Sequence, residues 1–86
     1  MSFTKEELQI RVGKTLREIR QLYGLPIETV AFEAEMEYNQ LSRIERGKVS
    51  TTAYSIEKVC TALKVPLSTF FLMVETGDIS KVAPKQ

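Results

Sequence analysis

The stretch from Leu25 to Lys48 constrains the fold more than any other part of the chain. It contains two short helical patterns, at about 26–34 and 38–46, and the three residues between them suffice only for a turn. Pro26 suits the first turn of a helix, where its missing N–H costs nothing. Gly47 follows the second pattern, and a glycine in the left-handed conformation commonly ends a helix. The sequence therefore predicts two short helices joined by a tight corner.

The second of these helices has two chemically different faces. Leu41 and Ile44 point to one side. Four polar residues spaced i, i+3, i+4 and i+7 share the other side: Asn39, Ser42, Arg43 and Arg46. A short helix that presents such groups, propped on another helix, suits the major groove of DNA. A solvated face on an ordinary small helical domain explains the pattern equally well, so the pattern alone leaves both interpretations open.

A longer set of residues resembles the helix-turn-helix of the Cro and phage-repressor family, also called the xenobiotic-response-element family. The run SRIERGK at 42–48 is the most specific part, and the similarity extends from about Arg11 to Phe71. The matching residues are Leu16, Arg17, Arg20, Gly24, Leu25, Glu28, Val30, Ala31, Leu41 to Glu45, Gly47, Lys48, Ile56, Leu63, Val65, Pro66 and Phe70. The resemblance implies an all-α, five-helix lambda-repressor-like DNA-binding domain at 1–75, followed by a short tail at 76–86.

The resemblance also implies a function. The chain is expected to be a sequence-specific transcriptional regulator that binds a palindromic operator in double-stranded DNA as a homodimer. Base-reading positions fall on Tyr38, Asn39, Ser42 and Arg43. Phosphate contacts are expected from Lys14, Arg17, Arg20, Arg46 and Lys48. The family usually opens the first helix of the motif with a glutamine, whereas this chain has Ile27, which puts that backbone contact in doubt.

The alternative from a different class is a helical protein-interaction module, such as an antitoxin or an adaptor, that keeps the fold with weak or no DNA binding. Residues 25–37 favour it, because they carry four glutamates and no basic residue, a net charge of −4. Residues 38–51 oppose it, because three basic residues against Glu45 give a net charge of +2. Glu33 and Glu35 are expected to point away from DNA.

Composition bounds the remaining possibilities. Eighty-six residues make one domain. One cysteine cannot form an intrachain disulfide, and no segment reads as a membrane span or a signal peptide, so a cytoplasmic protein is expected. Without histidine, the common zinc sites and Ser–His or Cys–His catalysis are unavailable. No enzyme activity, cofactor, metal or small-molecule ligand is predicted.

The first helix is expected from about Lys5 to Tyr23. Thr4 and Glu7 have the spacing of a capping box, and the apolar stripe consists of Leu8, Val12, Leu16, Ile19 and Tyr23. In the resembling family an arginine at the place of Arg20 pairs with the glutamate at the place of Glu45. This pair is expected to clamp the first helix to the third while the guanidinium edge stays near a phosphate.

Two more helices follow, at about 53–63 and 67–74. Cys60 lies in the apolar stripe of the fourth helix and is interpreted as a small core residue rather than a reactive thiol. The fifth helix is apolar nearly all round, which requires a second burial partner. The family often uses this helix for dimerisation, so Phe70, Leu72 and Met73 are expected at a dimer interface. The tail from Ile79 to Gln86 is expected to be mobile or to pack on a neighbour.

Overall fold

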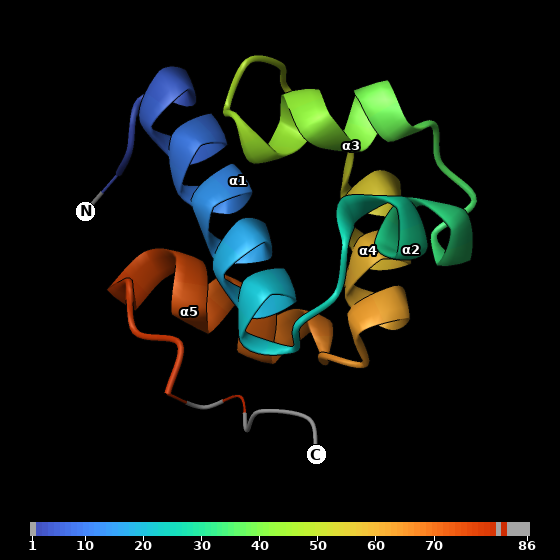
Figure 1. Ribbon diagram of the computed structural model, residues 1–86. Helices are drawn as coiled ribbons and strands as arrows, with labels where there is room; N and C mark the ends of the chain where they lie inside the picture. Colours follow the sequence, from blue (N-terminus) through green and yellow to red (C-terminus); the bar gives the residue numbers. More distant parts are fainter. Residues whose placement is uncertain (1, 81, 83–86) are drawn as a thin grey trace.

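The structure, a computed structural model, describes residues 2–80 and residue 82. Within this part of the chain it contains five α-helices and no strand, as predicted (Figure 1). The helices are α1 (Lys5–Leu22), α2 (Ile27–Glu33), α3 (Tyr38–Glu45), α4 (Ala53–Leu63) and α5 (Leu67–Thr76). α1 packs against both α3 and α5, and α2 packs against α3 and α4.

The helix ends follow from local chemistry. The capping box at the start of α1 is confirmed: Thr4 Oγ1 accepts from the Glu7 N–H at 3.1 Å, and Glu7 Oε1 accepts from the Thr4 N–H at 2.8 Å. Thr52 caps α4 by accepting from the Ser55 N–H at 3.0 Å. Pro26 lies at the N-cap of α2 rather than in its first turn. α5 continues to Thr76, two residues beyond the predicted end, and stops at Gly77, whose φ is +77°.

The turn between α2 and α3 is very short. Ala34 is the C-cap of α2, and Glu35 adopts a left-handed conformation with φ of +55°. The Met36 N–H donates to the Ala31 carbonyl at 2.9 Å, which closes the corner. Met36 packs against the core through its apolar side chain. These contacts fix α3 at a definite angle to α2.

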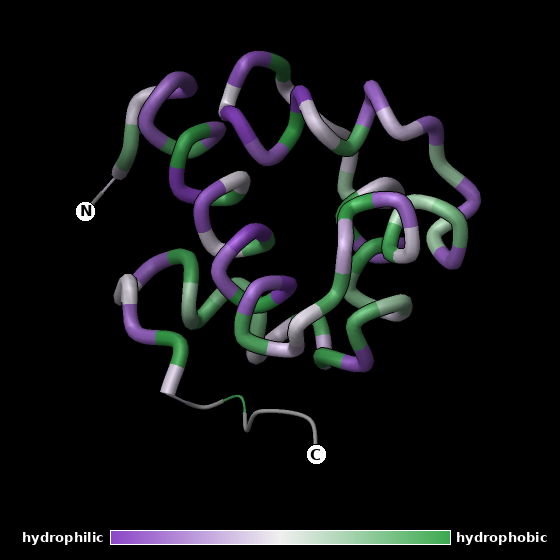
Figure 2. The backbone as a smooth tube through the Cα atoms, in the orientation of Figure 1, coloured by the Kyte–Doolittle hydropathy of each residue, from purple (hydrophilic) through white to green (hydrophobic). Residues whose placement is uncertain are grey.

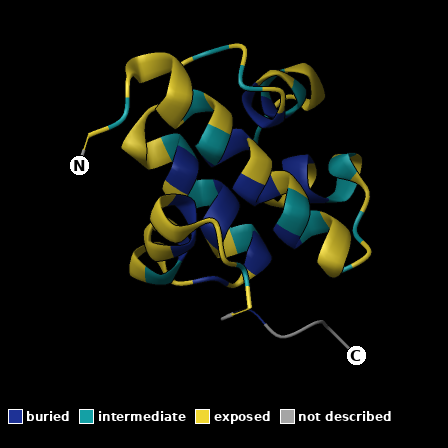
Figure 3. Cartoon of the chain, turned by 90° about the vertical axis from the view of Figure 1, so that its left-hand side faces the viewer, coloured by how far each residue is buried: buried dark blue, intermediate teal, exposed yellow. Residues whose placement is uncertain are grey.

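The core lies where the helices meet, and all five contribute to it (Figures 2 and 3). Leu16, Ile19 and Leu41 are almost completely buried, and Cys60 is a buried core residue as predicted. Leu8 is an exception to the predicted stripe, since it is 42% exposed near the free end of α1. Ile79 and Val82 pack against the protein's own core, so the prediction of a tail that is mobile or packs on a neighbour was wrong for these two residues. The rest of that prediction, on 81 and 83–86, lies outside the described residues.

The fifth helix is turned differently from the prediction. Phe70 and Met73 have no exposed surface, so they are core residues and cannot meet a partner. Leu67, Phe71 and Leu72 are 38, 38 and 44% exposed. The prediction of Phe70 and Met73 at an interface was therefore wrong, and only Leu72 of the three predicted residues is accessible.

No single helix among the described residues is long and apolar enough to cross a membrane. α4 and α5 together meet the criterion by length and composition only, and the chain bends by 102° between them.

Candidate nucleic-acid interface

α3 lies along one edge of the molecule, with its outer side free of other helices (Figure 1). Its inner side is fixed by Leu41 and Ile44, both of which are buried. On the outer side Asn39, Arg43 and Arg46 are exposed and Ser42 is half-buried. The amide and guanidinium groups predicted to share one face are therefore accessible together.

α1 approaches the end of α3 very closely, and Gly13 makes this possible. A methyl group at Gly13 would collide with the carbonyl oxygen of Ile44 and would lie 2.6 Å from that of Glu45. Gly13 was not among the residues predicted from the sequence. Its signal was a glycine inside a helix, where glycine costs up to about 1 kcal/mol relative to alanine and so often marks a close approach.

The predicted pair of Arg20 and Glu45 is present beside this contact. Arg20 Nε lies 2.7 Å from Glu45 Oε2, and Nη2 lies 2.9 Å from Oε1, a two-point contact. Arg20 Nη1 donates to the Leu25 carbonyl at 2.9 Å, so one side chain joins α1, α3 and the connection to α2. The pKa of Arg20 is raised, chiefly by the hydrogen bond to Glu45. α3 is thus anchored at its C-terminal end.

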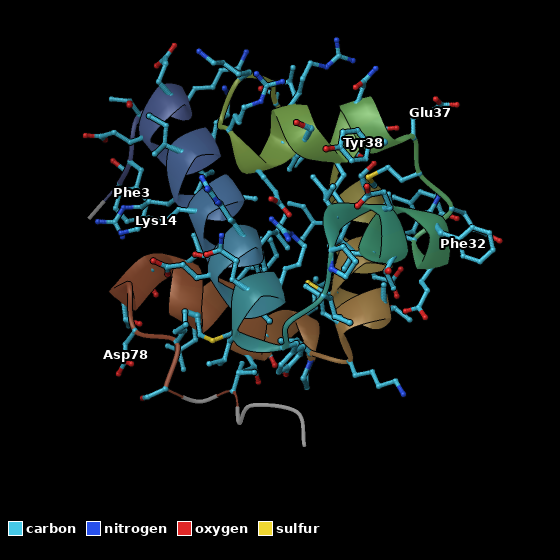
Figure 4. The ribbon with its side chains drawn as sticks, in the orientation of Figure 1. Phe3, Lys14, Phe32, Glu37, Tyr38 and Asp78 are labelled. Atoms are coloured by element: carbon cyan, nitrogen blue, oxygen red, sulfur yellow. The ribbon has the colours of Figure 1, made fainter. Side chains whose placement is uncertain are left out.

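Three arginines converge on a polar hollow of about 260 Å³ beside α3. Its lining consists of Arg17, Arg20, Ile27, Tyr38, Ser42, Glu45 and Arg46. Tyr38 projects from the first turn of α3 above α2 (Figure 4), and it is 48% exposed. Guanidinium groups around an open hollow form a site suited to an anion such as a phosphate.

A second hollow of about 280 Å³ lies on the other side of α3. Arg43 borders it, together with residues that were not predicted from the sequence to belong to the site: Gln40, Ser50, Thr51, Thr52 and Ser55. The signal was the run of three hydroxyl residues at 50–52, directly before α4. These hydroxyl groups widen the polar surface that continues from α3.

Lys14 does not border the hollow that Arg17, Arg20 and Arg46 share. Lys14 borders a hollow shared with Val74, Thr76 and Gly77, next to the end of α5. Its Nζ lies 3.9 Å from Glu18 Oε2 in an exposed pair. Figure 4 places Lys14 on the side of α1 away from α3. Lys48, by contrast, is exposed directly after Gly47 at the end of α3.

The acidic part of the motif lies on its outside. Glu28, Glu33, Glu35 and Glu37 are all exposed. Phe32 is 83% exposed and projects from α2 away from α3 (Figure 4). Among the described residues, no group of three or more His, Cys, Asp or Glu could hold a metal ion. The polar chemistry of this surface therefore rests on arginine, amide and hydroxyl groups.

This fold and surface define a helix-turn-helix DNA-binding protein. Residues 16–70 match the helix-turn-helix family. The chain belongs to this family of Cro- and repressor-like transcriptional regulators.

Several relatives are similar over most of the chain. The transcriptional regulator ClgR of Mycobacterium tuberculosis is 33% identical over 67 residues, which are 78% of this chain and 58% of that protein. The HTH-type transcriptional regulator SutR of Escherichia coli is 31% identical over 81 residues, which are 94% of this chain and 46% of that protein. The chain thus spans about half the length of these relatives.

Solved structures show the same fold. ClgR of Corynebacterium glutamicum superimposes with a TM-score of 0.78 at 23% identity, over 81% of this chain and 74% of that one. The restriction-modification controller protein C.Esp1396I, solved as a tetramer with its natural 35-base-pair operator, superimposes with a TM-score of 0.76 at 28% identity. That match covers 87% of this chain and 93% of the controller protein.

Proposed function

We propose that this protein regulates transcription by placing α3 in the major groove of a palindromic operator as a homodimer. The observation that carries the proposal is the accessible row of Asn39, Ser42 and Arg43 on a helix anchored by Arg20 and Glu45. An asparagine can bind adenine at two points and an arginine can bind guanine at two points in the major groove. The operator complex of the controller protein supports the proposal, since its fold covers 87% of this chain.

Phosphates flank the base-reading residues in this proposal. The hollow beside α3 receives one phosphate through Arg17, Arg46 and the N–H groups of Arg20 that are not used by Glu45 and Leu25. The Tyr38 ring packs on a thymine methyl, or its hydroxyl reaches the same phosphate. Lys48 binds a further phosphate beyond the end of α3. Lys14 is left out of this set, because it lies beside α5.

The dimer uses the accessible side of α5. Leu67, Phe71 and Leu72 are exposed there, and Leu8 of α1 is exposed close to Phe71. A two-fold dimer buries the same patch from both copies and closes the assembly. It also sets the α3 helices of the two copies about 34 Å apart, which is one turn of DNA.

Selection of binding sites from random double-stranded DNA tests this function. We expect one enriched sequence with two inverted half-sites whose centres are about 10 base pairs apart. The affinity for DNA should fall steeply as the salt concentration rises, because protein binding releases counterions from the phosphates. Recovery of no preferred sequence would contradict base reading by α3.

The cytoplasmic location expected from the sequence stays a prediction.

One observation favours the alternative of a protein-interaction module. Phe32 is 83% exposed beside the exposed Glu28 and Glu33, and an exposed aromatic ring among acidic groups suits a basic, apolar protein partner. An electrophoretic mobility experiment with the selected DNA distinguishes the two functions. The alternative predicts no salt-dependent shift, whereas the proposed function predicts a shift that Phe32→Ser leaves unchanged.

A further inference from the structure

An apolar cavity of about 240 Å³ opens on the surface between α1, α4 and α5. Its apolar lining comes from four helices and the α3–α4 connection: Leu8, Val12, Ile44, Val49, Ile56 and Phe71. A cavity of about 150 Å³ lined by such residues can hold benzene. This one is therefore large enough for a branched or aromatic side chain.

The mouth of the cavity is itself apolar. Val12, Ile44 and Ile56 are buried, whereas Leu8 and Phe71 at the rim are 42 and 38% exposed. Leu8 and Phe71 also border a second shallow hollow that continues toward Phe3. A pocket for a small ligand encloses most of that ligand within its walls. Apolar surface that spreads beyond the mouth is typical of a protein-association surface.

The charges around this surface suit a second copy of the same chain. Lys5 borders the cavity, and Glu75 borders the adjoining hollow, so opposite charges lie on two sides of Leu8 and Phe71. A two-fold axis through such a patch places the lysine of each copy opposite the glutamate of the other. Leu72 follows Phe71 on α5 and, at 44%, is the most exposed large apolar residue of that helix.

We propose that this cavity is a socket that the partner's Leu72 fills in the homodimer. The inference rests on the proposed function, because it requires that the protein dimerise. By symmetry each copy supplies one leucine and one socket. The cavity is then completed only by the second copy.

The socket is in contact with α3, the helix proposed to enter the major groove. Ile44 belongs to α3 and lines the cavity. Ser50 Oγ donates to Gln9 Oε1 at 2.6 Å, and Gln9 Nε2 lies 3.5 Å from the Gly47 carbonyl oxygen. Both Gln9 and Ser50 border the cavity. Filling it should therefore slow hydrogen exchange of the amides at 47–51, which follow α3.

Benzene titrations followed by NMR of the methyl groups of Val12, Ile44 and Ile56 test the proposal. In the dimeric wild-type protein these signals should not shift, because the partner's Leu72 occupies the cavity. In Leu72→Glu, which should be a folded monomer, benzene should shift all three. Leu22→Glu is the matched control, since Leu22 is an exposed leucine at the other end of α1, and it should behave like the wild type.

A second variant fills the socket from within. Ala53 is exposed and borders the cavity, so Ala53→Leu should fold and raise the dimer dissociation constant by roughly tenfold or more. Wild-type protein that sediments as a monomer at tens of micromolar would overturn the homodimer and the socket together. A wild-type dimer that admits benzene, or an Ala53→Leu dimer of unchanged affinity, would overturn the socket alone and leave the homodimer standing.

Discussion

Arg20 of α1 and Glu45 of α3 form an ion pair that is almost enclosed by the protein. Arg20 Nε lies 2.7 Å from Glu45 Oε2, and their side chains are only 14 and 5% exposed. Burial of two charges is costly, so such a pair says more about geometry than about net stability. Its geometric effect is clear, because Arg20 also donates to the Leu25 carbonyl and so fixes the start of the motif.

Replacing one partner of this pair should lower the free energy of unfolding. Arg20→Met leaves the Glu45 carboxylate buried and unpaired, and we expect the free energy of unfolding to fall by on the order of 3 kcal/mol. In Arg20→Met/Glu45→Leu the loss should be clearly smaller than the sum of the two single losses. Urea denaturation measures the loss in unfolding free energy for the two single variants and the double variant. The exposed pair of Lys14 and Glu18 is the control, and its coupling should stay below about 0.5 kcal/mol. Additive losses for Arg20 and Glu45 would show that the pair is not coupled.

The second prediction concerns the contact between α1 and α3 at Gly13. Gly13→Ala introduces a methyl group against the Ile44 and Glu45 carbonyls, and these are backbone atoms that can move only with α3. We expect a loss of about 1–3 kcal/mol in unfolding free energy and weaker DNA binding by the protein that remains folded. Gly77→Ala is the matched control, because its methyl group meets nothing within 4 Å while its φ of +77° is unfavourable for alanine. It should lower stability without changing DNA affinity.

The sequence was sufficient for features that depend on local pattern and register. The two helices of the motif and the capping box at Thr4 were predicted from such patterns. The pairing of Arg20 with Glu45 was predicted from the family resemblance. Gly13 was missed because its role depends on which helix crosses α1 at that point. Periodicity also could not orient α5, which is apolar on most sides. Packing against α1 and α4 buried Phe70 and Met73 and left Phe71 and Leu72 exposed. Leu8 follows the predicted stripe but lies at the rim of the open cavity between α1, α4 and α5, which leaves it 42% exposed.

The third prediction follows from Cys60 in the core. Burial, with a smaller effect of Glu57, raises the pKa of its thiol to about 12 from 9.0. Between these values the unfolded chain loses the thiol proton and the folded chain keeps it, so the unfolded state binds fewer protons. Stability should therefore fall as pH rises from about 9 to 12, with a slope of up to about 1.4 kcal/mol per pH unit.

Urea denaturation at several pH values tests this dependence. Cys60→Ala should be less stable at pH 8 because of the lost packing, but its stability should decline less steeply above pH 9. Burial also raises the pKa of Tyr23, which acts in the same direction, so Tyr23→Phe serves as the companion variant. Equal slopes in the wild type and in Cys60→Ala would contradict a raised thiol pKa.

The last prediction separates base reading from phosphate binding. Arg43 lies on the exposed face of α3, and Lys48 lies beyond its end. Arg43→Ala should lose about 1–3 kcal/mol on the selected operator and relax the preference at one base position, because a two-point contact with guanine is removed. Lys48→Ala should weaken binding to all sequences alike and reduce the slope of log affinity against log salt by about one. Both variants should fold normally, since both side chains are exposed. Equal losses on operator and random DNA for Arg43→Ala would assign Arg43 to the phosphates and move base reading to Asn39 and Ser42.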